Sequence, residues 1–328
     1  MQKDLDLTGI GNALVDLQIQ VDYSDLERFG IKKGEMRLIE DDFRNEILTG
    51  LSDKKINVCS GGSGANSIVA FAALGGKAAY NTILGDDKYG KFYADEFNQL
   101  DIKLSAPFIE GRETGVCTVL ITPDSERSML TSLSVNAEFK EEYVNEEYIA
   151  KAKWIYLEGY KLDHDNPRKA IKAAAQMAKD NKTNIAFTFS DVFIIDNFRK
   201  DCEQILDDTS LVFCNEHEAM SFTQKDNVED AFKELCKVVP NVAVTLGKEG
   251  SLIYWNKEKY VIPPYPAVRL DTTGAGDMFA GAFFYGMMNF NSIEKAGHLA
   301  SIASAKIVSV LGARLKEDPK NLIAQLMI

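Results

Sequence analysis

The sequence predicts an α/β protein with a doubly wound, mostly parallel sheet that helices cover on both faces, together with a small β-sheet lid. Short strand-like segments alternate with helix-like segments through most of the 328 residues, and this alternation is typical of a parallel sheet. Polar or glycine-rich segments follow several of these strands, where open α/β sheets bind their ligands. A hydrophobic fraction of 45% is enough to build one large or two modest domains.

The strands of the large sheet are predicted from short apolar segments at residues 6–9, 153–157, 184–189, 209–214 and 242–246. Helical periodicity follows two of them, at residues 167–179 and 228–238. We therefore expect a large α/β domain, which binds nucleotide and substrate, at residues 1–12, 41–106 and 134–328.

The lid is predicted from two regions that interrupt this rhythm, residues 13–40 and 107–133. Polar and apolar residues alternate within the second region, at residues 115–122 and 127–133, as they do in antiparallel strands. Between these two segments lies a Pro-Asp-Ser sequence, which favours a turn. We expect one small, discontinuous β domain built from both regions.

Charge and cysteine usage exclude several classes of protein. A formal net charge of -12 and a pI near 4.9 provide no basic surface for nucleic acid or anionic lipid. The five cysteines lack C-x-x-C spacing, which argues against zinc and against a disulfide framework. No apolar run approaches the roughly 18 residues of a membrane span, and the acidic N-terminus lacks a signal-peptide core. We expect a cytoplasmic protein, monomeric or homodimeric, whose partners are small molecules.

The most informative segment, DTTGAGD, runs from Asp271 to Asp277 and leads directly into a strongly apolar helix. The first N–H groups of a helix have no partner within it and lie at the positive end of its dipole, so they attract an oxyanion. Gly274, Ala275 and Gly276 allow that anion to approach the backbone. Asp277 would repel phosphate, and a base that takes a proton from an attacking hydroxyl explains it better. The pattern indicates a kinase, although Asp and Thr before a helix are also common caps.

A second glycine cluster, SGGSGAN, precedes an apolar helix and lies downstream of the segment GNALVD. Glycine lets a ligand approach the backbone, and amide and carboxylate side chains bind sugar hydroxyls. A turn that leads into a tightly packed helix is the alternative interpretation. The expected substrate contacts in the two segments are Asn12, Asp16, Gly62, Ser63 and Asn66.

Asn215 and Glu218 follow a predicted strand in the sequence NEHE. Residues three apart share one face of a helix, and their amide and carboxylate oxygens suit a hydrated magnesium ion. A helix cap with Glu at its third position is an equal alternative.

Weaker candidates follow other predicted strands. Thr245, Gly247 and Gly250 are candidates for the ATP-binding side, together with Asn215. Glu158 is a candidate for contact with substrate hydroxyls, although an ordinary polar loop explains it as well. The sequence GDDKYGKF has the spacing of a Walker A loop, but Phe92 replaces the hydroxyl residue that binds magnesium, so we interpret it as a surface turn. No G-x-G-x-x-G follows the first strand, which argues against an NAD-dependent enzyme.

The motifs GNALVD, SGGSGAN, N-x-x-E and DTTGAGD occur in the order seen in the ribokinase-like (PfkB) family of carbohydrate kinases. The chain resembles this family over about residues 9–312, and its adenosine kinase-like branch most. The resemblance implies a ribokinase-like fold and an ATP-dependent kinase with Mg2+ as cofactor. It also implies Asp277 as the catalytic base and Arg127 as a phosphate or lid contact. A monovalent cation such as K+ would be held by Asp271, Thr273 and carbonyls near residues 308–312.

The acceptor implied by the resemblance is adenosine, phosphorylated at its 5′-hydroxyl in purine salvage. A free sugar such as ribose or fructose is the alternative, and a nucleoside- or sugar-binding regulator without turnover is a third interpretation. A nucleoside base needs an apolar slot in the lid. Candidates for that slot are Leu14, Phe108, Cys117, Val119 and Leu133.

Overall fold

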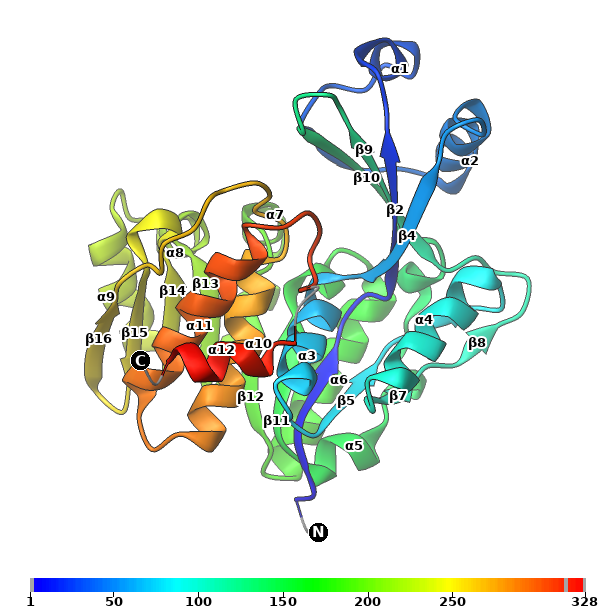
Figure 1. The fold of residues 1–328 in the computed structure, drawn as a ribbon. Helices are drawn as coiled ribbons and strands as arrows, with labels where there is room; N and C mark the ends of the chain where they lie inside the picture. The colour runs from blue at the N-terminus through cyan, green and yellow to red at the C-terminus, as the bar shows by residue number, and fades with distance from the viewer. Residues whose placement is uncertain (1–2, 316–317, 327–328) are drawn as a thin grey trace.

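The computed structural model describes residues 3–315 and 318–326 and shows a main body from which a smaller sheet projects (Figure 1). The remaining positions of the ranges predicted for the large domain, 1–2, 316–317 and 327–328, lie outside the described residues. The larger sheet consists of β1 (Leu5–Ile10), β5 (Ala78–Asn81), β7 (Lys103–Ser105), β11 (Ala152–Glu158), β12 (Asn184–Thr188), β13 (Leu211–Asn215), β14 (Val242–Thr245), β15 (Ser251–Trp255) and β16 (Glu258–Ile262).

These strands are arranged in the order β16-β15-β14-β13-β12-β11-β1-β5-β7. All neighbours from β7 to β14 pair in parallel, and only the edge strands β15 and β16 run antiparallel. The predicted strands correspond to β1, β11, β12, β13 and β14. Apolar residues follow one another without alternation in β12 and β13 because both faces of the sheet are covered. The α/β fold class is therefore confirmed.

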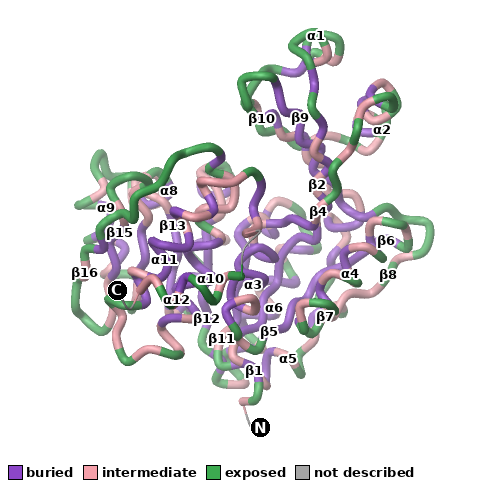
Figure 2. The backbone as a smooth tube through the Cα atoms, in the orientation of Figure 1, coloured by how far each residue is buried: buried purple, intermediate pink, exposed green. Residues whose placement is uncertain are grey.

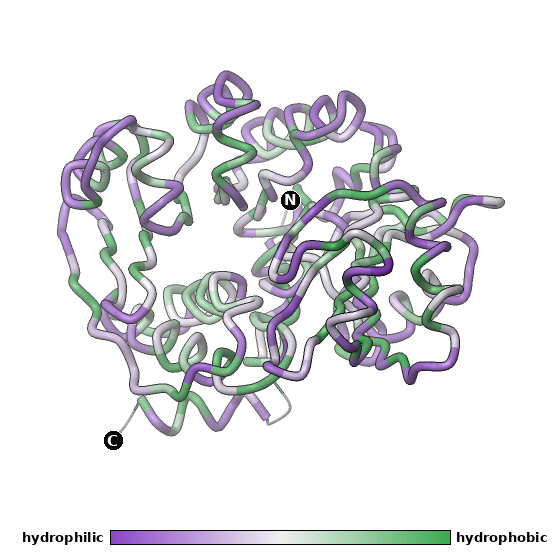
Figure 3. The backbone as a smooth tube through the Cα atoms, turned by 90° about the horizontal axis from the view of Figure 1, so that it is seen from above, coloured by the Kyte–Doolittle hydropathy of each residue, from purple (hydrophilic) through white to green (hydrophobic). Residues whose placement is uncertain are grey.

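Two apolar layers cover the sheet. Core residues of α3, α4, α10 and α11 form one layer, and core residues of α6, α7 and α9 form the other. Seen from above, hydrophilic and hydrophobic residues alternate along the outer helices (Figure 3). No helix in the described part of the chain has both the length and the apolar character needed to cross a membrane. The helices are α1 (Tyr23–Arg28), α2 (Asp41–Gly50), α3 (Ser63–Ala73), α4 (Lys88–Gln99), α5 (Glu146–Lys151), α6 (Asp165–Asp180), α7 (Val192–Leu206), α8 (Glu216–Thr223), α9 (Val228–Val238), α10 (Ala275–Asn289), α11 (Ile293–Ile307) and α12 (Lys320–Gln325).

The smaller sheet has the strand order β3-β10-β9-β2-β4. Its antiparallel hairpin β9–β10 matches the two strands predicted on either side of the turn. Leu26 of α1 and Ile47 of α2 pack into the core of this sheet, and buried residues continue from the main body into its strands (Figure 2). The strands are β2 (Leu14–Gln20), β3 (Met36–Leu38), β4 (Ile56–Gly61), β9 (Gly115–Ile121) and β10 (Arg127–Ser132).

The strand pairing differs from the predicted domain ranges at two places. β4 pairs with β2 and α2 packs on the same sheet, although both lie in the range 41–106 predicted for the large domain. Conversely, β8 (Phe108–Ile109) lies within the predicted lid but pairs with β6 (Leu84–Gly85) in a separate two-stranded sheet. The division into domains stays a prediction, and we propose a lid at residues 13–61 and 115–133.

Candidate active site

The DTTGAGD segment folds as a tight turn into α10. Gly274 precedes the helix with a φ of 76°, and a Cβ there would lie 2.7 Å from the Cβ of Ala313, so glycine is required. The N–H of Ala275 donates to the carbonyl of Thr272 at 3.2 Å. The N–H of Ala275, which we predicted as one of the donors to an oxyanion, is therefore already hydrogen-bonded within the turn.

Free donors remain on both sides of Ala275. Among residues 3–315 and 318–326, the backbone N–H groups of Gly274, Gly276 and Asp277 have no hydrogen-bond partner. They belong to the turn and the first residues of α10, where the dipole of the helix favours negative charge. A phosphoryl group that approaches this turn would meet unpaired donors.

Asp277 lies beside these donors in the first turn of α10. Its carboxylate accepts hydrogen bonds from Ser63 Oγ at 2.6 Å and Asn66 Nδ2 at 3.0 Å. Burial raises the pKa of Asp277 to about 6, although these two hydrogen bonds and the charge of Arg314 lower it. Asp277 is therefore mostly ionised at neutral pH yet more basic than an exposed aspartate, as a general base requires. Ser63 and Asn66, predicted as substrate contacts, hold the Asp277 carboxylate.

A cavity of about 790 Å³ opens in front of Asp277, between the lid and the carboxyl ends of the central strands. This volume is in the range of small-molecule sites. Of the residues predicted as catalytic, substrate, ATP or metal contacts, those that do not line the cavity are Arg127, Gly247, Gly250 and Asp271. Those that line it are Asn12, Asp16, Gly62, Ser63, Asn66, Glu158, Asn215, Glu218, Thr245, Thr273, Gly274, Ala275, Gly276 and Asp277.

Asn12 lines the cavity, and two hydrogen bonds hold its backbone. Its N–H donates to Glu158 Oε2 at 2.8 Å, and its carbonyl accepts from the Tyr80 hydroxyl at 3.2 Å. The neighbouring Ala13 exchanges two hydrogen bonds with the side chain of Asn136, at 2.9 and 2.8 Å. Glu158 is buried and burial raises its pKa to about 7. Glu158 thus positions Asn12 in addition to lining the cavity.

Asp16 enters the same end of the cavity from β2. Burial raises its pKa to about 6, although the charges of Arg127 and Arg314 lower it. A Cβ at the adjacent Gly61 would lie 2.5 Å from an Asp16 carboxylate oxygen, so glycine leaves the room that this side chain occupies. Asp16 and Asp277 therefore bring two carboxylates to the same cavity.

The lid contributes an apolar wall to the cavity. Leu14, Cys117 and Leu133 line it, as predicted for a base slot. The predictions of Phe108 and Val119 as lining residues were wrong: Phe108 lies in β8, outside the smaller sheet, and Val119 is buried within the lid. The same wall includes side chains that the sequence did not single out, Met36, Leu38 and Met129.

Asn215 and Glu218 form a reciprocal cap at the start of α8. Asn215 Oδ1 accepts from the N–H of Glu218 at 2.9 Å, while both carboxylate oxygens of Glu218 accept from Asn215, at 2.6 and 3.1 Å. Asn215 and Glu218 thus form the helix cap that was the alternative prediction, and both residues also line the cavity. Burial raises the pKa of Glu218 to about 7, and no lysine or arginine of the described residues is among the groups that shift this pKa. A buried carboxylate without a cation fits a role near hydrated Mg2+.

Asp271 lies behind the turn and is fully engaged. Its carboxylate accepts from the N–H groups of Thr273 and Gly312, both at 2.9 Å, and forms a buried ion pair with Arg127 of β10. Although burial would raise it, these contacts keep the pKa of Asp271 below its usual value. The guanidinium already provides positive charge at this carboxylate, which weighs against Asp271 as a K+ ligand. The requirement for K+ stays a prediction.

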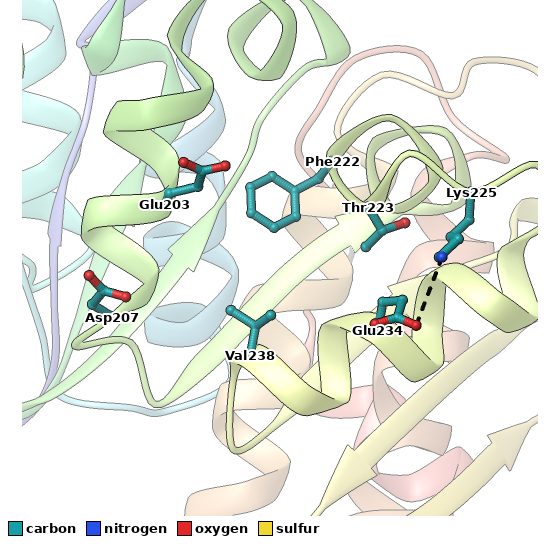
Figure 4. Close-up of a pocket in the computed structure, with 7 residues that line it drawn as sticks. All are labelled: Glu203, Asp207, Phe222, Thr223, Lys225, Glu234 and Val238. Carbon is teal, nitrogen blue, oxygen red and sulfur yellow. Dashed lines mark ion pairs between the residues drawn. The ribbon is translucent and has the colours of Figure 1, made fainter.

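A second hollow, of about 350 Å³, lies between α7, α8 and α9 (Figure 4). Glu203 of α7 and Asp207, the residue that follows α7, line it, and two further lining residues, Lys225 and Glu234, form an ion pair at 3.9 Å. None of the motif residues reaches this hollow. It is therefore not the candidate site.

The sequence missed several residues around the cavity. Arg37, Tyr156, Asp191 and Phe193 line it without belonging to any motif. Arg314 does not line it but donates to Asn66. For Asp191, a signal was present: it follows a buried strand, as ligand-binding residues of α/β sheets do.

The comparisons with known proteins agree with this geometry. The family model "pfkB family carbohydrate kinase" matches residues 29–321. The structure of a probable sugar kinase from Rhizobium etli CFN 42 has a TM-score of 0.90 and 30% identity, with 99% of each chain covered. An adenosine kinase structure from Sinorhizobium meliloti has a TM-score of 0.89 and 31% identity, with 98% of this chain and 99% of that chain covered. Adenosine kinase 1 from Arabidopsis thaliana is 26% identical over 337 residues, which cover 95% of this chain and 96% of that protein. The chain belongs to the pfkB family of carbohydrate kinases and is a phosphotransferase with an alcohol group as acceptor.

Proposed function

We propose that the chain transfers the γ-phosphoryl group of ATP to the 5′-hydroxyl of adenosine. One observation carries the proposal: the Asp277 carboxylate and the unpaired N–H groups of the 274–277 turn lie side by side at one cavity. A base for a hydroxyl and donors for a charged phosphoryl group are the two parts that phosphoryl transfer needs in one place.

The residues that line the cavity support a nucleoside as acceptor. The lid wall is mostly apolar, with Leu14, Met36 and Leu133 among its residues, and this wall suits the flat base. Asn12 and Asp16 lie in the same cavity and suit ribose hydroxyls. Relatives of similar length are named adenosine kinases.

The residues of the chain divide the chemistry among them. Asp277 accepts the proton of the attacking hydroxyl, while Ser63 and Asn66 hold its carboxylate in place. The free N–H groups of the turn stabilise negative charge on the phosphoryl oxygens. Bound Mg2+ would supply charge neutralisation between the phosphates, and Asn215 and Glu218 are the residues that would hold it through water. Thr245 borders the ATP-binding side of the same cavity.

An ADP-release assay with adenosine, inosine, ribose and fructose tests the proposal, with and without Mg2+ and K+. We expect Mg2+-dependent ADP formation with adenosine above the other acceptors, and AMP as the second product. Adenosine binding without ADP formation would instead support a regulator without turnover.

A free sugar is the second candidate acceptor. Arg37 brings a charged group to the mostly apolar lid wall, and a structural relative is described as a probable sugar kinase. Higher kcat/KM with ribose or fructose than with adenosine would favour it. Purine salvage, a cytoplasmic location and the monomeric or homodimeric state stay predictions of the sequence.

A further inference from the structure

Arg314 lies outside every sequence motif, yet it contacts a partner of the catalytic base. It follows Gly312 and Ala313 in the segment after α11. Its Nη1 forms an ion pair with Glu96 of α4 at 2.5 Å, and its Nε donates to Oδ1 of Asn66 at 3.4 Å. The Arg314 side chain is 17% exposed, so packing holds it.

Only one orientation of the Asn66 carboxamide serves both of its neighbours. Its Nδ2 donates to Asp277, and its Oδ1 accepts from Arg314. Turned by half a rotation, the amide would present its oxygen to the Asp277 carboxylate and its NH2 group to a guanidinium. Because a guanidinium only donates and an ionised carboxylate only accepts, both contacts would then be repulsive. Arg314 therefore selects the orientation in which Asn66 donates to the base.

The two residues before Arg314 contact the same catalytic turn. The N–H of Gly312 donates to the Asp271 carboxylate at 2.9 Å, and Ala313 lies against Gly274, where a Cβ would be only 2.7 Å away. Three successive residues thus contact the catalytic turn and the start of α3. This arrangement couples the position of Asn66 to that of the turn.

We propose that Arg314 is a positioning residue for phosphoryl transfer and acts by holding Asn66 in the orientation that donates to Asp277. The inference rests on the proposed kinase activity. Arg314 does not line the cavity, so it does not act by touching the acceptor. Its positive charge also lowers the pKa of Asp277, against the effect of burial.

A double-mutant cycle tests this role, with Arg314→Met, Asn66→Ala and the double variant compared by steady-state kinetics. We expect Arg314→Met to lower kcat roughly ten- to hundredfold, the order of loss caused by a misplaced catalytic group. KM for adenosine should change little, because Arg314 lies outside the cavity. The double variant should lose no more kcat than Asn66→Ala alone, because one change already removes the path through which the other acts.

Two further variants separate positioning from general destabilisation. Arg314→Lys retains a charged donor and should recover most of kcat. Arg112→Met is the matched control, because Arg112 also pairs with a glutamate, Glu138, but on the surface; it should keep wild-type kcat. Circular dichroism and thermal melting verify folding, and Arg314→Gln replaces Arg314→Met if the latter does not fold.

The outcomes distinguish this inference from the proposed function. Wild-type kcat in Arg314→Met, or losses that multiply in the double variant, would overturn the positioning role while the kinase activity stands. If the wild-type protein forms no ADP with any acceptor, the proposed function fails instead.

Discussion

Gly276 offers a substitution that should remove activity without harming the fold. Apart from its chain neighbours and the backbone of α10, a Cβ built at this position has no heavy atom within 4 Å, and the φ of Gly276 lies outside the region reserved for glycine. The residue lines the cavity at the start of α10, and its N–H is unpaired in the described residues. In Gly276→Ala the methyl group would therefore occupy space beside the donors that a phosphoryl group is expected to use.

Gly276→Ala should affect stability and activity in opposite directions. Alanine in a helix is more favourable than glycine by about 0.5–1 kcal/mol, so the free energy of unfolding should stay equal or increase by up to that amount. Loss of access to a charge-stabilising donor costs roughly 10²–10³ in kcat. The variant should therefore be as stable as the wild type and yet nearly inactive.

Denaturant unfolding and ADP release with adenosine measure these two quantities on the same preparation. Adenosine binding, measured by calorimetry without ATP, should remain because the methyl group lies at the phosphate end. Wild-type kcat in a folded Gly276→Ala variant would refute the assignment of the 274–277 turn as the phosphoryl site.

Three further predictions concern charged groups of the site. Because burial raises the pKa of Asp277 to about 6 and the base must be deprotonated, kcat/KM should fall about tenfold per pH unit below about pH 6. The Asp16→Asn variant should show the same fall at low pH. A profile that is flat below about pH 6 contradicts the assignment of Asp277 as the base. Glu218→Gln should increase the Mg2+ concentration needed for half-maximal kcat, and an unchanged Mg2+ titration argues against Glu218. Arg127→Met leaves the Asp271 carboxylate buried without its cation, so the free energy of unfolding, measured by urea unfolding, should decrease by about 3–5 kcal/mol. A decrease below about 1 kcal/mol is incompatible with a buried ion pair between Arg127 and Asp271.

The large sheet was predictable because its signals are local. Each central strand is a short apolar run, and residues 167–179 and 228–238 repeat with helical periodicity within α6 and α9. The turn at Gly274 was predictable for the same reason, since a few adjacent small residues before an apolar helix define it. These patterns of apolar and small residues can be recognised from residues that are adjacent in the sequence.

Strand partners and contacts between distant residues were not predictable in this way. Nothing in the sequence of β4 shows that it pairs with β2 in the smaller sheet and not with the large one. Ser63 and Asn66 were placed at the substrate, but they hydrogen-bond to Asp277, more than two hundred positions along the chain. Arg314 carried no signal at all, because an arginine after a helix is common at protein surfaces.

The most direct test of the central claim is the turnover of Asp277→Asn at saturating adenosine and MgATP. Asparagine has almost the same shape and keeps the contacts to Ser63 and Asn66 within reach, but it cannot accept the proton. We predict that the variant folds, binds adenosine and releases ADP about 10²–10⁴ times more slowly than the wild type. Turnover within about twofold of the wild type would contradict the role of Asp277 as the base.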